Sequence, residues 1–251
     1  MTTTLGLIGS GLIGSTLARL AVAAGLDVVL SNSRGPDTLA DLVADLGGHA
    51  RAGTPGEAAR DGDLVVATVP LGAHHRLPAA ELAGKTVIDT MNYYPQRDGR
   101  IPELDSNTLT TSQLVQRHLA DSHVVKAFNN IAFANLATLA RPAGAPDRSA
   151  LPVAGDDPAG KARVVALLDT IGYDAVDIGT LADSWRSEPE TPVYVQPYLP
   201  GQPPEELSLE EAQRWLVTTP GVPVPADQVR KLVDAAVRGV AGGRLPGRMT
   251  D

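Results

Sequence analysis

Residues 4–14 have the sequence TLGLIGSGLIG, in which three glycines with the spacing GxGxxG follow a short apolar run. The run is typical of a strand, and the apolar spacing of residues 12–24 predicts a helix directly after the glycines. Gly9 would permit a tight turn, Gly11 would let a pyrophosphate approach the backbone, and Gly14 would let the helix pack closely on the sheet. The alternative is a plain glycine turn between a strand and a helix. Because the start of such a helix presents unpaired N–H groups, we interpret the stretch as the phosphate-binding loop of a dinucleotide site.

The segment after the next predicted strand indicates which dinucleotide is bound. NAD-binding sites usually carry an acidic residue there, which holds the ribose hydroxyls. Residues 31–36 read SNSRGP, and the first acid is Asp37. The guanidinium of Arg34 can bind a 2′-phosphate bidentately, whereas a carboxylate would repel it. The neutral donors beside it are Ser31, Asn32 and Ser33. The pattern predicts NADP(H); the alternative is that Arg34 is a solvated loop residue.

Strand and helix patterns alternate along most of the chain. Strands are predicted at residues 4–8, 27–30, 49–52, 64–69, 86–90, 124–127, 151–154 and 175–178. Helices are predicted between them at residues 12–24, 38–46, 57–60, 78–82, 112–119, 131–139 and 158–171. Residues 91–108 read as a polar loop longer than most connections, which favours a functional loop. The alternation predicts an α/β fold of the Rossmann type, with a doubly wound and mostly parallel sheet.

The composition changes near residue 188. Six prolines fall within residues 188–206, so this stretch can form neither a helix nor a central strand. A capping box at Ser208 predicts a helix to residue 217, and a last helix with an apolar stripe is expected at residues 227–240. We therefore divide the chain into an NADP-binding Rossmann domain, residues 1–187, and a small C-terminal extension of a Pro-rich arm and helices, residues 188–251. The apolar stripe must be buried, either on another subunit or on the chain's own Rossmann domain.

Composition narrows the class of protein further. The chain has 251 residues and a net charge of −8, which argues against nucleic acid and against an anionic membrane surface as partners. It has no cysteine, and His49, His118 and His123 lack the spacing of metal ligands, so no metal site is expected. No apolar run approaches the roughly 20 residues that span a bilayer, and the N-terminus lacks the charged segment of a signal peptide. We expect a cytoplasmic protein that acts on a small molecule.

Five segments of the chain carry a resemblance to a known family. They are residues 5–14, 31–36, 68–70, 126–131 and 155–157. The glycine loop is common to many folds, but a Ser-Arg pair at residues 33–34 followed at this spacing by KAFNNI at residues 126–131 is much more specific. Over residues 5 to about 187 the chain resembles the NADPH:coenzyme F-420 oxidoreductase family, in its bacterial branch.

The resemblance implies an NADP-dependent oxidoreductase that forms homodimers and transfers a hydride between NADP(H) and a deazaflavin, coenzyme F-420, or a similar acceptor. It also implies roles for individual residues. Beside Gly9, the residues that would cover the pyrophosphate are Ser10, Gly11, Leu12 and Ile13, and those that would hold the 2′-phosphate are Ser33 and Arg34. Those that would border the nicotinamide ribose are Val69, Pro70, Leu71, Met91 and Asn92. Asn129 and Ile131 match positions where family members contact the deazaflavin ring.

One residue departs from the family pattern. The deazaflavin-using archetype has a histidine where this chain has Asn129, and an asparagine cannot titrate. The proton for the acceptor would then come from elsewhere, and the candidates are His74, His75, Tyr93, Tyr94 and water. The departure keeps a second interpretation open, the reduction of a small imine or carbonyl by NADPH without a deazaflavin. A third interpretation is a non-catalytic NADP-binding sensor.

Overall fold

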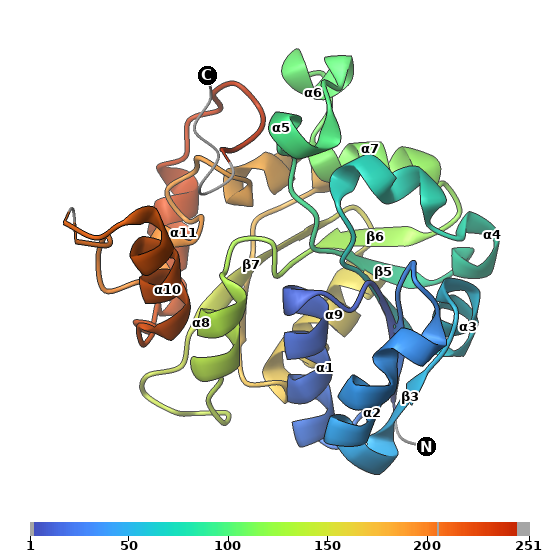
Figure 1. The fold of residues 1–251 in the computed structure, drawn as a ribbon. Coiled ribbons are helices and arrows are strands. Elements are labelled where there is room, and N and C mark those ends of the chain that lie inside the picture. The colour runs from blue at the N-terminus through green and yellow to red at the C-terminus, as the bar shows by residue number, and fades with distance from the viewer. Residues whose placement is uncertain (1–2, 205, 245–251) are drawn as a thin grey trace.

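The computed structural model describes residues 3–204 and 206–244 and contains an eight-stranded sheet with the order β3-β2-β1-β4-β5-β6-β7-β8 (Figure 1). The strands are β1 Thr4–Ile8, β2 Asp27–Ser31, β3 Ala50–Ala52, β4 Leu64–Ala67, β5 Thr86–Asp89, β6 His123–Lys126, β7 Ala150–Gly155 and β8 Asp174–Asp177. The first six strands are parallel, β7 runs antiparallel to β6, and β8 is parallel to β7. The prediction of a Rossmann-type, mostly parallel sheet is confirmed.

The helices pack on both faces of this sheet. They include α1 Leu12–Ala23, α2 Ala40–Leu46, α3 Pro55–Asp61, α4 Ala79–Leu82, α7 Thr111–His118, α8 Phe133–Thr138 and α9 Pro158–Thr170. In β2, Val28 and Leu30 belong to a core cluster with residues of α1, α8 and α9, whereas Val29 belongs to a second cluster with residues of α3 and α7. Because successive side chains of a strand point to opposite faces, the two clusters mark the two faces. Within residues 3–204 and 206–244, no helix has the length and apolarity needed to cross a membrane.

Several predicted boundaries differ from the structure, and three of the differences have a local reason. β4 ends at Ala67 and not at residue 69, because Pro70 cannot donate a backbone hydrogen bond and restricts the residue before it. The loop at residues 91–108 contains two one-turn helices, α5 Pro95–Asp98 and α6 Pro102–Asp105, each of which begins at a proline. The last helix, α11 Ala226–Asp234, ends before residue 240, since Val237 and Val240 are 87% and 78% exposed and have nothing to pack against.

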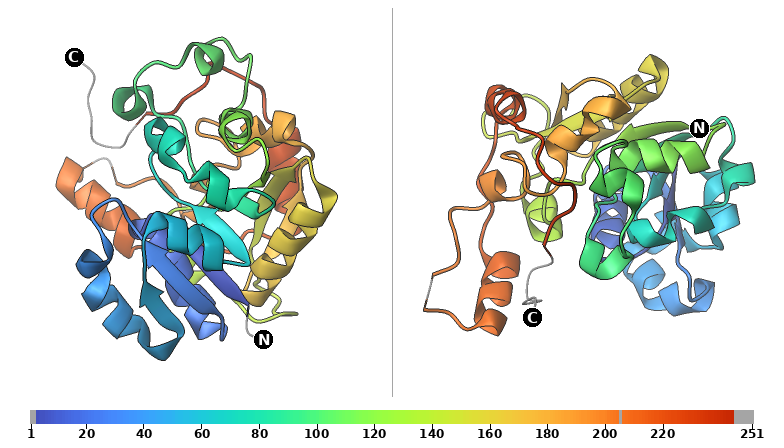
Figure 2. Two further views of the ribbon diagram at one scale, coloured as in Figure 1. Left: turned by 90° about the vertical axis from the view of Figure 1, so that its right-hand side faces the viewer. Right: turned by 90° about the horizontal axis from the view of Figure 1, so that it is seen from above.

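The C-terminal segment packs on the chain's own sheet. Tyr198, Val224 and Val229 are buried in the same cluster as the residues of β7, and the amide of Ala150 in β7 donates to the carbonyl of Val224 at 2.8 Å. Of the two predicted alternatives for burying the apolar stripe, the structure shows packing on the chain's own Rossmann domain. Helix α10 Leu209–Thr218 contacts α8 and projects from the rest of the fold when seen from above (Figure 2). Residues 205 and 245–251 of the predicted extension lie outside the described residues.

Candidate active site

A cavity of about 870 Å³ lies at the carboxyl ends of the central strands. Its walls come from the start of α1, from the segments that follow β4, β5 and β6, and from residues 190–199 of the C-terminal segment. This is the edge of a doubly wound sheet where ligands bind, and the volume lies within the range of roughly 300–1,000 Å³ that is usual for ligand pockets. The cavity therefore joins the predicted phosphate loop to a wall that only the C-terminal segment supplies.

The glycine loop has the geometry of a phosphate cradle. Gly9 has φ +109°, and a Cβ there would lie 2.3 Å from the carbonyl oxygen of Thr68. A Cβ on Gly14 would lie 2.1 Å from the carbonyl oxygen of Gly9, whereas a Cβ on Gly11 would meet nothing within 4 Å. The first helical turn of α1 has no acidic residue and its N-cap makes no side-chain hydrogen bond. The N–H groups and the open space over Gly11 fit the pyrophosphate of a dinucleotide.

The segment predicted to select NADP(H) divides into buried and exposed residues. Ser31 is fully buried, and its hydroxyl donates to the carbonyl oxygen of Leu7 at 2.8 Å. Asn32 accepts a hydrogen bond from the backbone N–H of Arg34 at 2.8 Å. Ser33 and Arg34 are exposed, and among the described residues the guanidinium of Arg34 forms no ion pair. Of the four predicted donors, Ser33 and Arg34 are therefore open to solvent, while Ser31 and Asn32 form hydrogen bonds within the protein.

Most of the residues predicted around the nicotinamide and the acceptor line the cavity. From the predicted set, the lining residues are Gly11, Leu12, Ile13, Val69, Pro70, Met91, Asn92, Asn129 and Ile131. Those outside the lining are Gly9, Ser10, Ser31, Asn32, Ser33, Arg34 and Leu71. Leu71 begins the 3-10 helix η3 Leu71–Arg76 and is fully buried in the second core cluster. Its side chain therefore supports the site from behind and does not border the cavity.

Asn129 lies in the cavity wall, but its amide is occupied by neighbouring residues. Its Nδ2 donates to the carbonyl oxygen of Ser187 at 2.7 Å and to Oδ1 of Asn92 at 3.1 Å, and its Oδ1 accepts from the Ser187 hydroxyl at 3.2 Å. Asn92 in turn donates to the backbone carbonyl of Asn129 at 2.8 Å. Asn129 is 4% exposed. Through these hydrogen bonds it connects the segment after β6 to the segment after β5 and to the end of η4 Leu181–Ser187.

Of the sequence candidates for a proton donor, the structure places Tyr94 in the cavity wall. Nδ1 of His74 donates to the carbonyl oxygen of Leu71 at 2.8 Å, and the ring packs edge-on against His118. His74 does not line the cavity, and burial lowers its pKa. The hydroxyl of Tyr93 donates to Asp105 at 2.9 Å, away from the cavity. Tyr94 is half-buried and remains the sequence candidate with access to a ligand in this space.

Tyr194 also lines the cavity, and sequence reasoning missed it. Its hydroxyl forms a short hydrogen bond with the hydroxyl of Tyr94, one hundred positions away in the sequence. Burial, together with the neighbouring Tyr94 hydroxyl, raises the pKa of Tyr194, and burial also raises the pKa of Tyr94. Tyr194 lies in the Pro-rich stretch, whose composition predicts an extended arm but says nothing about where the arm lies.

The backbone around the cavity is strained. Four described non-glycine residues have positive φ, and three of them line the cavity: Phe128 at 60°, Glu190 at 68° and Val195 at 56°. A left-handed conformation is unfavourable for a β-branched or aromatic residue and costs about 1–3 kcal/mol. Strained residues of this kind gather where a binding site requires a particular chain path, which supports a functional role for this cavity.

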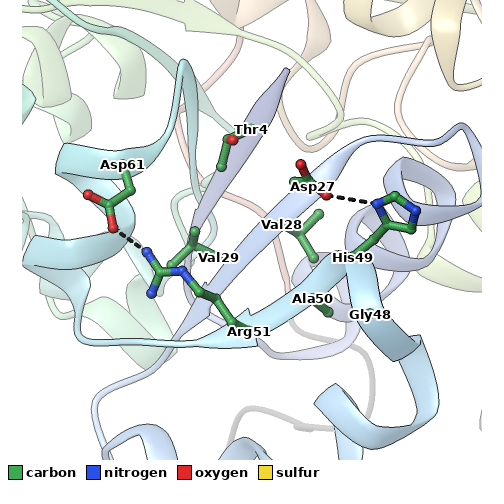
Figure 3. A pocket seen from close by; sticks show the side chains of 9 residues that line it. All are labelled: Thr4, Asp27, Val28, Val29, Gly48, His49, Ala50, Arg51 and Asp61. Atoms are coloured by element: carbon green, nitrogen blue, oxygen red, sulfur yellow. Dashed lines mark hydrogen bonds and ion pairs between the residues drawn. The ribbon is translucent and has the colours of Figure 1, made fainter. Parts of the chain in front are cut away.

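A second pocket, of about 390 Å³, opens at the opposite end of the strands (Figure 3). It is lined by the first residues of β1 and β2 and by charged side chains that pair with one another, Asp27 with His49 at 2.7 Å and Arg51 with Asp61. These side chains are 44–54% exposed. Because its polar side chains pair with one another and it lies away from the glycine loop, we do not regard it as the nucleotide site.

Comparison with known proteins finds a family match in the N-terminal part of the chain, which contains the glycine loop. Residues 4–93 match the model of the family described as NADP oxidoreductase coenzyme F420-dependent. The predicted family resemblance is confirmed over these residues. The match supports the prediction of an NADP-dependent oxidoreductase.

Individual proteins give similarity of different extents. The protein YjhV of Escherichia coli (strain K12) is 43% identical over 53 residues, which are 21% of this chain and 39% of that protein's length. The crystal structure of a hypothetical protein, SMa0349 from Sinorhizobium meliloti, is 28% identical, with a TM-score of 0.68 over 77% of this chain and 93% of that chain. A "putative f420 dependent nadp-reductase" from Arthrobacter sp. FB24 is 24% identical, with a TM-score of 0.62 over 73% of this chain and 87% of that chain, and shows the fold.

Proposed function

We propose that the chain transfers a hydride between NADP(H) and a deazaflavin of the coenzyme F-420 class. The observation that carries the proposal is the continuity of the cavity, which extends from the glycine loop past Met91 and Asn92 to Ile131 and Tyr194. When bound there, NADPH supplies the hydride, and the protein contributes position and electrostatics. One continuous space in which a nicotinamide and a second ring can meet is what this reaction requires.

The chain's own residues have separable tasks in this proposal. The N-terminus of α1 and Gly11 hold the pyrophosphate, and Ser33 and Arg34 hold the 2′-phosphate. Val69, Pro70, Met91 and Asn92 border the nicotinamide ribose. Leu12, which is 63% exposed although apolar, lines the mouth of the cavity, and Phe128 and Ile131 line its wall. An exposed leucine and an aromatic wall suit a flat ring that enters from solvent.

The purified chain should be mixed with NADPH in the presence and absence of coenzyme F-420, with the absorbance of both cofactors followed. We expect NADPH oxidation only when coenzyme F-420 is present and is reduced with it. Oxidation with an imine or carbonyl panel but not with coenzyme F-420 would overturn the deazaflavin assignment. Tight NADPH binding without turnover on any acceptor would favour the sensor.

A second candidate function, the reduction of a small imine or carbonyl by NADPH, is favoured by one observation. Where the deazaflavin-using archetype has a histidine, Asn129 has both amide hydrogens bound by Ser187 and Asn92. An acceptor with a polarised C=N or C=O bond would need a separate proton donor at the cavity wall. The same acceptor panel distinguishes this function from the first.

We also propose that the active form is a cytoplasmic homodimer. Each chain of it would consist of two units, residues 1–187 and residues 188–251. The exposed Val217, Val237 and Val240 of the second unit support an interface, since large exposed apolar side chains gather at contact surfaces. Light scattering at several concentrations should give twice the chain mass of 26.1 kDa. A mass of one chain at every concentration would contradict the homodimer.

A further inference from the structure

The hydroxyls of Tyr94 and Tyr194 meet at the wall of the cavity, and the two residues lie one hundred positions apart in the sequence. Tyr94 follows β5, at the N-terminus of α5, and Tyr194 belongs to the C-terminal segment. Asn92 donates from Nδ2 to the Tyr194 oxygen at 3.5 Å, so this oxygen already accepts one hydrogen bond and its own proton can be directed at Tyr94. With Tyr194 as the donor, the proton of Tyr94 is free to point into the cavity. The geometry thus permits hydrogen bonds donated in the order Asn92 to Tyr194 to Tyr94.

Both tyrosines are held in place by hydrogen bonds of the backbone beside them. The backbone N–H of Tyr94 donates to Asp98 Oδ2 at 2.9 Å, and Asp98 Oδ1 accepts from the N–H of Gly72 at 3.1 Å. On the other side, the N–H of Val195 donates to the carbonyl of Asn130 at 2.8 Å. The left-handed φ of Val195 then turns the chain directly after Tyr194. Strain that is maintained beside one side chain indicates that its position matters.

Burial keeps a proton on the two hydroxyls at neutral pH, while a neighbouring cation eases the transfer of the proton from Tyr94. The guanidinium of Arg97 lies 5.0 Å from the centre of the Tyr94 ring and would stabilise a phenolate there. The carboxylates of Asp98 and Glu190 act in the other direction. Burial is the largest influence and raises the pKa of both tyrosines, so each carries its proton when the acceptor arrives.

We propose that Tyr94 donates the proton that accompanies hydride transfer to the acceptor, and that Tyr194 is a positioning residue that donates a hydrogen bond to the Tyr94 oxygen. The proposal rests on the proposed function. In the step, the hydride from NADPH adds to the electrophilic carbon of a C=N or C=O group or of a deazaflavin ring, and the π electrons move to the heteroatom. The O–H bond of Tyr94 breaks as an N–H or O–H bond forms on the acceptor. NADPH is oxidised to NADP⁺, and the Tyr94 phenolate regains its proton from water.

We call this arrangement, in which Tyr194 donates a hydrogen bond to Tyr94 and Tyr94 donates a proton to the acceptor, the tyrosine relay. The tyrosine relay predicts a graded loss of activity. Tyr94→Phe should lower single-turnover reduction by about 10²–10⁴-fold, the usual contribution of a positioned general acid. Tyr194→Phe should lower it less, since the donor is retained. Tyr198→Phe is the matched control, because Tyr198 lies in the same segment and its hydroxyl donates to the Ala150 carbonyl, outside the cavity. All three variants should bind NADPH within about threefold of the unmodified chain.

A spectroscopic readout tests the pair without turnover. In a chain labelled with ¹³C at the tyrosine ring, the Tyr94 signal should titrate at a higher pH in Tyr194→Phe than in the unmodified chain, because the phenolate loses its hydrogen-bond donor. An unmodified chain that reduces no acceptor contradicts the proposed function itself. If the unmodified chain reduces an acceptor and Tyr94→Phe does so at the same rate, or Tyr198→Phe is equally impaired, the tyrosine relay alone is overturned.

Discussion

The ammonium group of Lys126 lies 3.2 Å from the carboxylate of Asp89, and neither side chain is more than 1% exposed. Lys126 also donates to Thr111 Oγ1 at 3.0 Å and to the carbonyl of Met91, whose N–H donates to Asp89 Oδ1 at 2.8 Å. Met91 borders the cavity and is thus held at both its N–H and its carbonyl by one buried ion pair. Lys126 is the first residue of the KAFNNI motif. It does not line the cavity, but its contacts with Met91 and Asp89 fix the position of Met91, which does.

Replacement of Lys126 by methionine should lower the free energy of unfolding by about 3–5 kcal/mol, because Asp89 would be left as an uncompensated buried charge. Urea denaturation measures the change. Lys231→Met is the control: Lys231 pairs with Asp227 on the exposed face of α11, and the loss of such a surface pair costs about 0–1 kcal/mol. An equal, small effect of both substitutions would show that the buried pair is not structurally important.

Alanine substitutions at two glycines of the loop should have different effects, one on NADPH binding and the other on stability. Gly11→Ala should fold with a stability loss below about 1 kcal/mol, because its Cβ meets no protein atom, but should lose NADPH affinity by about tenfold or more. Gly14→Ala should be destabilised by about 1–3 kcal/mol, since its Cβ would collide with the Gly9 carbonyl. Thermal unfolding and NADPH titration separate the two. Normal NADPH binding by Gly11→Ala would place the pyrophosphate elsewhere.

Arg34→Ala should weaken NADPH binding by about 1–3 kcal/mol and leave NADH binding nearly unchanged, since a charge-assisted contact to the 2′-phosphate is lost. Calorimetric titration with both cofactors measures this. Arg51→Ala, which changes an arginine at the opposite end of the strands, should affect neither (Figure 3). Equal losses for NADPH and NADH would show that Arg34 is structural.

Asn129→Ala should lower turnover while NADPH affinity stays within about threefold. Stability should fall by about 1–3 kcal/mol, since the buried Ser187 carbonyl loses a donor. Ser187→Ala keeps that carbonyl and removes only the hydroxyl, so its effects should be smaller. Steady-state kinetics and urea denaturation of both variants provide the comparison. Unchanged turnover of Asn129→Ala with every accepted substrate would remove Asn129 from the site.

The local patterns of the sequence predicted the sheet well because they depend on short-range physics. The apolar runs of β4 and β7 predict strands because both faces of these strands are buried. The glycines after β1 predict a turn because only glycine allows its conformation. The position of Arg34 after β2 could be predicted for the same reason. These features are decided within about ten residues of chain.

The far wall of the cavity could not be predicted, because contacts distant in sequence determine it. Tyr194 approaches Tyr94 only after the Pro-rich segment folds back over the segment after β6, where Asn130 binds the carbonyl of Val193 at 3.1 Å. Proline restricts the path of such a segment but does not select the surface on which it packs. Similarly, an asparagine side chain such as that of Asn129 can serve a ligand or the protein's own backbone, and only its neighbours decide which.

The most direct test of the account follows the hydride itself. The chain is given NADPH fully deuterated at nicotinamide C4 together with coenzyme F-420, and the reduced acceptor is analysed by mass spectrometry after a single turnover. We predict that each reduced acceptor carries one deuteron on carbon, as direct transfer within one cavity requires. Oxidation of NADPH with no deuterium in the acceptor, or no oxidation with coenzyme F-420 or any imine or carbonyl, would contradict the account.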